Sequence, residues 1–234
     1  MTNALTLRRT RSLSEILSAS FAVYGDARLR LRLLTLSIPG IVFGLCAIAL
    51  TRTLPEWTST FPVFVLSFIE TAVLGSAAIH ALDRVERGED VSIGASLAKA
   101  WERVPDLLVA AAMSFAIIGA LCITVVGIPF AVIRMVRWSL TSQAIMIDEQ
   151  EGDAALGYCA SLVAGYGWPT AGKLLAIFAV QYVPGSVVVE LLGLTFDRFY
   201  LAFVNVALTA LLFPFGVTAR TLLYYDLKTR KALA

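Results

Sequence analysis

Histidine and the common catalytic motifs are nearly absent from this sequence. His80 is the single histidine in 234 residues, so neither an HExxH zinc motif nor a histidine-rich metal site can form. No Walker A loop, GxGxxG or GxSxG pattern occurs, and the acidic run 148–153 lacks the spacing and central glycine of an EF-hand. No nucleophile, base and orienting group can be named as one set. These absences predict a protein that is not an enzyme and that binds no metal and no cofactor.

Charged residues are also scarce. They make up 15% of the chain, against about 25% in soluble domains, and 58% of the residues are apolar, against about 45–50%. The apolar residues lie in long blocks, which is typical of an integral membrane protein. The basic residues are thinly spread beside these blocks, which argues against nucleic-acid binding.

Cysteine is rare and unpatterned. Cys46, Cys122 and Cys159 are odd in number and form no CxxC motif, so we expect free thiols in or near spans, with a disulfide or metal site as the other interpretation. We also expect no cleavable signal peptide, because no small-residue cleavage site follows the first apolar block, which starts near Leu33. We therefore expect the first span to remain in the mature protein.

Apolar runs of about 20 residues identify the candidate spans, since about 30 Å of hydrocarbon needs that many helical residues. The fourth candidate carries Arg134 and Arg137, each costly to insert. The alternative is one long span over 107–133, which gives five spans in total. The six predicted spans are 33–50, 61–82, 107–126, 129–147, 174–194 and 201–224.

The distribution of Lys and Arg sets the orientation, because cytoplasmic loops carry the excess. With six spans, one side collects fifteen basic residues and the other only Arg52 and Arg198. We therefore expect the protein to lie in the plasma membrane, with both termini in the cytoplasm. A five-span model would move the cluster at 228–231 outside, so the charge pattern favours six. The fifteen are Arg8, Arg9, Arg11, Arg28, Arg30, Arg32, Arg84, Arg87, Lys99, Arg103, Lys173, Arg220, Lys228, Arg230 and Lys231.

Three segments between the spans show helical periodicity with one apolar face. They begin at a capping box formed by Ser12 and Glu15, at Ser92 and at Asp153, and each precedes a pair of spans. Two interpretations remain: these helices bind lipid head groups, or they cover the cytoplasmic ends of the bundle. The predicted fold is thus one all-α polytopic membrane helix bundle over 1–234, with six transmembrane helices as three hairpins, each preceded by a cytoplasmic amphipathic helix. The three units are 12–82, 92–147 and 153–224.

Four ionisable residues lie inside the predicted spans: Glu70, Arg134, Arg137 and Glu190. Glu70 and Arg137 lie roughly 13 and 12 Å deep, and Arg134 and Glu190 roughly 7 and 6 Å deep, at the helical rise. Because unpaired charges in hydrocarbon are costly, we predict two internal ion pairs, Glu70 with Arg137 and Glu190 with Arg134. The alternative is that these residues line an ion or substrate path.

Weaker signals suggest packing and lipid contacts. Gly40 and Gly44 form a GxxxG motif, which favours close helix packing inside the bundle or, as an alternative, a homodimer face. His80 is expected to be a hydrogen-bonded residue, with a proton relay as the alternative. Basic residues flanking the first and last spans either contact anionic lipids or only fix the orientation. These basic residues are Arg28, Arg30, Arg32, Lys228, Arg230 and Lys231.

The chain ends in its most specific pattern, Arg220-Thr-Leu-Leu-Tyr-Tyr-Asp-Leu-Lys-Thr-Arg230-Lys231. This stretch resembles the bacterial and archaeal membrane-domain family named for glycerophosphoryl diester phosphodiesterase. The resemblance implies a membrane fold without the activity, because in some relatives a separate soluble domain with His and carboxylate metal ligands carries that chemistry. Further stretches that are similar, in order, are Ser14-Glu15-Ile16-Leu17, Gly88-Glu89-Asp90-Val91-Ser92, Arg137-Trp138-Ser139, and the positions Leu156, Leu162, Gly165 and Trp168.

Two functions remain after these exclusions. The leading one is a non-enzymatic multi-pass membrane protein that acts as a scaffold, a partner subunit or a lipid-associated module. Its candidate partners are membrane lipids, another membrane protein or a second copy of this chain. The alternative is a small-molecule or ion transporter or channel that uses the four intramembrane charges.

Overall fold

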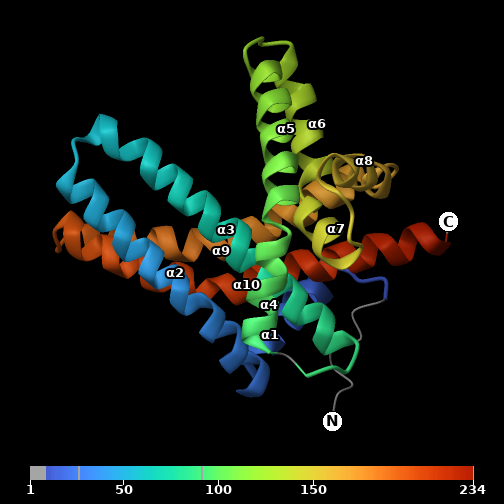
Figure 1. Cartoon of the computed structure of the whole chain (residues 1–234), viewed down its shortest axis with the longest axis horizontal. Coiled ribbons are helices and arrows are strands. Elements are labelled where there is room, and N and C mark those ends of the chain that lie inside the picture. The colour runs from blue at the N-terminus through green and yellow to red at the C-terminus, as the bar shows by residue number, and fades with distance from the viewer. Residues whose placement is uncertain (1–8, 26, 91, 234) are drawn as a thin grey trace.

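The computed structural model describes residues 9–25, 27–90 and 92–233 (Figure 1). Within these ranges every regular element is a helix, which confirms the all-α prediction. The helices are α1 (Leu13–Gly25), α2 (Ala27–Thr53), α3 (Glu56–Glu86), α4 (Ile93–Glu102), α5 (Val104–Cys122), α6 (Gly127–Trp138), α7 (Thr141–Ile147), α8 (Gly152–Val163), α9 (Gly167–Gly193) and α10 (Arg198–Leu233).

Five of these helices are long and apolar enough to cross a membrane, as expected for a multi-pass membrane protein. Their large apolar side chains point outward, including Phe61 at 73% exposure and Leu175 at 69%. Contiguous exposed apolar surface of this kind is unfavourable in water and favourable in lipid. The five candidate spans are Leu33–Thr53, Thr58–Glu86, Val104–Cys122, Gly167–Gly193 and Phe199–Leu233.

The predicted fourth span, 129–147, is divided between α6 and α7 rather than formed by one helix. At the break, the Ser139 hydroxyl donates to the Val136 carbonyl at 2.8 Å, and Thr141 donates to the Trp138 carbonyl at 2.7 Å. Both side chains thus satisfy carbonyls that a continuing helix would use. α6 alone is about 18 Å long at 1.5 Å per residue, whereas α7 is almost wholly buried in the protein.

Three helical hairpins diverge from a common region (Figure 1). α2 and α3 form the first, α5 and α6 the second, and α9 and α10 the third. In this view the turns of the first and third hairpins lie at the left, and the turn of the second lies at the top. The hydrophobic core sits where the hairpins meet and includes Leu36, Leu82, Ile145 and Leu223.

The three segments predicted to precede the hairpins are all helical, and they form α1, α4 and α8. The capping box is confirmed: Ser12 N donates to Glu15 Oε2 at 2.7 Å, and Glu15 N donates to Ser12 Oγ at 3.3 Å. The Ser12 amide holds the pKa of Glu15 below its usual range. Ser92 caps α4 by accepting from Ala95 N.

The predicted apolar faces of these helices divide between the core and the surface. On α8, Leu156, Cys159 and Leu162 are at most 5% exposed and belong to the core. Phe21 of α1 and Trp101 of α4 are instead 52% and 67% exposed. α8 therefore covers the bundle, whereas α1 and α4 also present aromatic side chains outward.

The GxxxG motif packs inside the bundle. A Cβ atom on Gly40 would lie 2.8 Å from Glu70 Oε1, and one on Gly44 would lie 2.7 Å from Val206 Cγ2. The two glycines therefore let α2 approach α3 and α10 closely, which confirms the intramolecular interpretation of the motif.

Candidate functional site

The C-terminal half of α10 carries three consecutive polar residues that are almost fully buried: Tyr224, Tyr225 and Asp226, each at most 1% exposed. Successive residues of a helix point about 100° apart, so these three reach three different parts of the chain. We call these residues and their charged or hydroxyl partners the polar hub. The partners are Arg11, Asp83, Arg87, Asp148, Tyr158, Lys173, Lys228 and Arg230.

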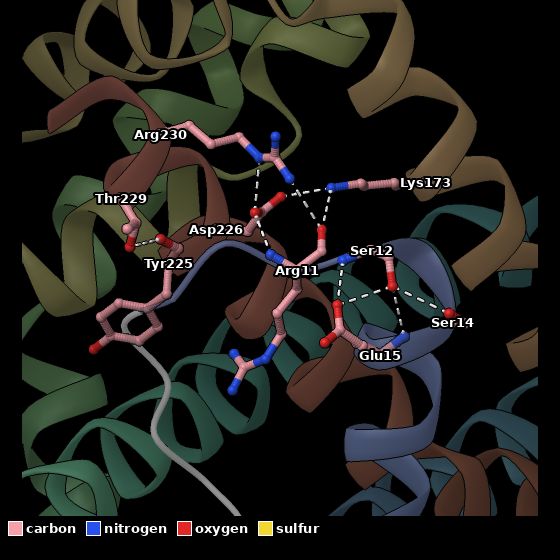
Figure 2. A network of polar contacts seen from close by, with 9 residues as sticks. All are labelled: Arg11, Ser12, Ser14, Glu15, Lys173, Tyr225, Asp226, Thr229 and Arg230. Carbon is pink, nitrogen blue, oxygen red and sulfur yellow. Dashed lines mark hydrogen bonds and ion pairs between the residues drawn. The ribbon is translucent and has the colours of Figure 1, made fainter. Parts of the chain in front are cut away.

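Asp226 joins the start of the described chain to the last two helices (Figure 2). Its carboxylate accepts from the Arg11 amide at 2.8 Å, from Lys173 Nζ of α9 at 2.5 Å and from Arg230 Nε at 2.8 Å. Lys173 and Arg230 also donate to the Arg11 carbonyl, at 3.1 and 3.2 Å. A fully buried carboxylate is thus surrounded by charge-assisted donors, which offsets the cost of its burial.

Asp148, between α7 and α8, is held in a similar way. Its Oδ2 accepts from Tyr224 and, at 3.0 Å, from Tyr158, and its Oδ1 accepts from Lys228. Burial raises the pKa of Asp148, but the hydrogen bonds from Lys228, Tyr224 and Tyr158 outweigh it and hold that pKa below its usual range. The carboxylate therefore remains ionised and ties the end of the second hairpin to α10.

Asp83, near the end of α3, completes the polar hub. It accepts from the Tyr225 hydroxyl at 2.6 Å and pairs with Arg87 at 2.7 Å. One side of α10 is therefore tied to the first hairpin, another to the second, and a third to α9 and the N-terminal segment. The three carboxylates of the polar hub are thus each held by a basic residue, and together they connect the hairpins to α10.

α10 is longer than a helix that only crosses the hydrocarbon, and the polar hub lies in its extra length. α10 has 36 residues, or about 54 Å at the helical rise, against about 30 Å of hydrocarbon. The polar residues gather at its C-terminal end, and α3, with 31 residues, likewise has its acidic end at the hub. This excess length allows the charged cluster to lie outside the hydrocarbon while the apolar parts span it.

A second polar feature is a cavity of about 310 Å³ between α2, α3 and α10. Its walls are mostly apolar or small residues, and Glu70 contributes a carboxylate. Among the described residues, no hydrogen bond or ion pair reaches this carboxylate. The other polar groups of the wall are Ser37, Thr51, Ser67, Asn205 and Thr209.

Comparisons with family models, with curated proteins and with solved structures found no match to this chain. Function is therefore inferred from the residues and their geometry.

The structure does not bring the predicted ion pairs together. Glu70 faces α2 and α10, whereas its neighbours Phe68 and Thr71 face α5 and α7 across another cavity. Arg137 lies instead in a groove beside the N-terminal end of α9. Equal depth places two residues at one level but does not set the side of the helix on which each lies, so α3 presents Glu70 away from α6.

Arg134 and Glu190 are also separated. The Arg134 guanidinium lies 5.2 Å from the Trp138 ring, and α6 borders α9 around Trp168. Glu190 is 22 residues further along α9, about 33 Å at the helical rise, and is exposed. In the described part of the chain, neither residue forms an ion pair.

The basic residues that were candidates for anionic-lipid contacts have different surroundings. Lys228 and Arg230 are engaged in the polar hub by Asp148 and Asp226. Lys231 is exposed, and exposed Arg30 donates to the Tyr24 carbonyl at 3.0 Å. The side chains of Arg28 and Arg32 lie outside the described residues.

Sequence reasoning missed the polar hub although two signals were present. The Tyr-Tyr-Asp pattern near residue 225 supported the family resemblance, and Asp148 belonged to the acidic run that was excluded as an EF-hand. Neither signal identifies partners, because Arg11 and Asp226 are 215 residues apart. His80 agrees with its simpler interpretation, since its Nδ1 lies 3.2 Å from the Ser96 hydroxyl.

Proposed function

We propose that this chain is a non-enzymatic membrane protein of the plasma membrane that serves as a scaffold, partner subunit or lipid-associated module. The observation that carries the proposal is the polar hub, which fastens both ends of the described chain and all three hairpins at one place. The long apolar helices radiate from this anchor with their side chains outward, so they offer large surfaces to lipid or to helices of another protein.

The polar hub supports six crossings rather than five. Arg11, before the first span, contacts Asp226, near the end of the last one. Two chain ends on one side of a membrane require an even number of crossings. α5 leaves the hub region and α6 with α7 returns to it (Figure 1), so we infer that the second hairpin crosses and returns like the other two, with α1, α4 and α8 at the cytoplasmic interface.

The proposed orientation places the polar hub in the cytoplasm. This agrees with the fifteen basic residues on that side, several of which belong to the hub. Exposed Arg30 and Lys231 remain available for anionic head groups, where each basic residue contributes about 1 kcal/mol. The resemblance to the membrane-domain family supports the same fold and location, because its Tyr-Tyr-Asp pattern supplies three residues of the hub.

Reconstitution into lipid nanodiscs tests the proposal. Nanodiscs of mixed zwitterionic and anionic lipid are formed around the wild-type protein and around a variant with Arg30→Gln and Lys231→Gln, and the retained lipids are quantified. We expect the wild type to be enriched in anionic lipid and the variant to be less so. The same discs should release no more glycerol 3-phosphate from glycerophosphocholine than empty discs; release by the protein contradicts the non-enzymatic role.

Transport is the second candidate, and the cavity at Glu70 is the observation that favours it. An intramembrane carboxylate facing a cavity is a common feature of substrate and ion paths. Uptake into vesicles that is lost in Glu70→Gln, with the variant still folded, would replace the scaffold role by transport.

A further inference from the structure

The cavity between α2, α3 and α10 holds a carboxylate that differs from the acidic groups of the polar hub. Asp83, Asp148 and Asp226 are each paired with a basic residue. A polar cavity of about 490 Å³ beside the hub is likewise lined by internally paired charges, such as Arg84 with Glu89 at 3.0 Å. Glu70 has no such partner among the described residues.

The surroundings of Glu70 favour a bound cation as the partner of its carboxylate. The residue lies in the middle of a candidate span, Thr58–Glu86, where water is scarce and an unpaired charge is costly. The described cavity wall contains no Lys, Arg or His. The Glu70 carboxylate itself packs against Gly40, where an added Cβ would lie 2.8 Å from Oε1.

The size and polarity of the cavity indicate the kind of cation. About 310 Å³ corresponds to the volume of roughly ten waters at about 30 Å³ each, which is far more than one metal ion occupies. Most of the wall is apolar, with Ala47, Leu74 and Val206 among its residues. A ligand that fits needs one positive charge and an apolar body.

Two further groups fit such a charge. Asn205 and Thr209 lie on the α10 side of the cavity, and no hydrogen bond within the described chain occupies their side chains. Their oxygens are acceptors that can solvate an ammonium group. We propose that this cavity binds a small monovalent organic cation, an ammonium head on an apolar body, with its charge at Glu70.

This proposal goes beyond the scaffold role and does not require transport, because binding is measured on the solubilised protein. Calorimetric titration with benzylammonium is the test, and ethylbenzene, which replaces the charged ammonium group by a methyl group, is the neutral isostere. We expect saturable binding of the cation to the wild type. Glu70→Gln should weaken it about tenfold or more, while the neutral isostere binds both proteins within about twofold.

Two variants keep the test decisive. Glu190→Gln removes another exposed carboxylate from a candidate span, one with no ion-pair partner among the described residues, and should leave cation binding unchanged. Ala47→Phe keeps Glu70 but fills the cavity, and should weaken binding about tenfold or more, even if Glu70→Gln fails to fold. The proposal is overturned by a lack of saturable binding to the wild type, by equal affinity in Glu70→Gln, or by unchanged affinity in Ala47→Phe.

Discussion

Replacing Asp226 by asparagine measures how strongly the polar hub holds the helices together. The Asp226 side chain is 0% exposed, and its partners Lys173 and Arg230 are 15% and 34% exposed. Asparagine keeps the shape but removes the charge, so Lys173 is left largely buried without its counter-ion. Breaking a buried pair in this way costs about 3–5 kcal/mol.

The expected change in melting temperature follows from that cost. For a chain of this length, 1 kcal/mol shifts the Tm by about 2–4 °C, so Asp226→Asn should lower it by about 6–20 °C. Thermal unfolding in detergent, followed by circular dichroism, gives the measurement. The matched control is Glu102→Gln, which removes an exposed partner of Lys99 at 3.5 Å and should change stability by less than about 1 kcal/mol.

A double variant separates the ion pair from other effects of the substitution. Adding Lys173→Met to Asp226→Asn removes the stranded charge, so the double variant should lose less stability than the sum of the two single variants. Simple additivity, or a Tm for Asp226→Asn equal to that of Glu102→Gln, refutes the reasoning that the hub is a buried fastening device.

Three further predictions follow from the packing and the charges. The pKa of Asp148 is lowered in the folded protein, so the ionised carboxylate stabilises the fold at pH values above its ordinary pKa of 3.8. This stabilisation is lost as the pH falls below that value, so the difference in Tm between the wild type and Asp148→Asn should narrow in acid. Burial raises the pKa of Cys159 to about 12; with Cys46→Ala and Cys122→Ala in place, maleimide should label the unfolded protein but not the folded one. Gly44→Leu forces a side chain into α10 and should destabilise by about 1–3 kcal/mol, which thermal unfolding can check.

Local signals in the sequence predicted local structure well. The Ser12 and Glu15 capping box depends on residues three positions apart, and both bonds form. Ser92 likewise caps the helix that it was expected to open. The long apolar runs predicted the five described helices that are able to span a membrane, because length and hydrophobicity are properties of each segment alone.

Features that depend on the relative placement of distant segments were less accessible. The predicted pairing of Glu70 with Arg137 relied on depth, but the direction of a side chain around its helix depends on packing that sequence does not reveal. The break after Trp138 was hidden for a related reason: Ser139 and Thr141 satisfy the helix end only once α7 is buried in the core.

Single-cysteine accessibility labelling tests the central claim most directly, namely that three hairpins cross the membrane from one cytoplasmic hub. Exposed positions suit this test: Glu151, between α7 and α8; Val125, in the α5–α6 turn; and Asp197, in the α9–α10 turn. Each cysteine is introduced into a protein from which Cys46 and Cys122 have been removed. In intact cells, a membrane-impermeant maleimide should label Val125→Cys and Asp197→Cys. It should label Glu151→Cys only after the cells are permeabilised. Labelling of Glu151→Cys in intact cells contradicts the account.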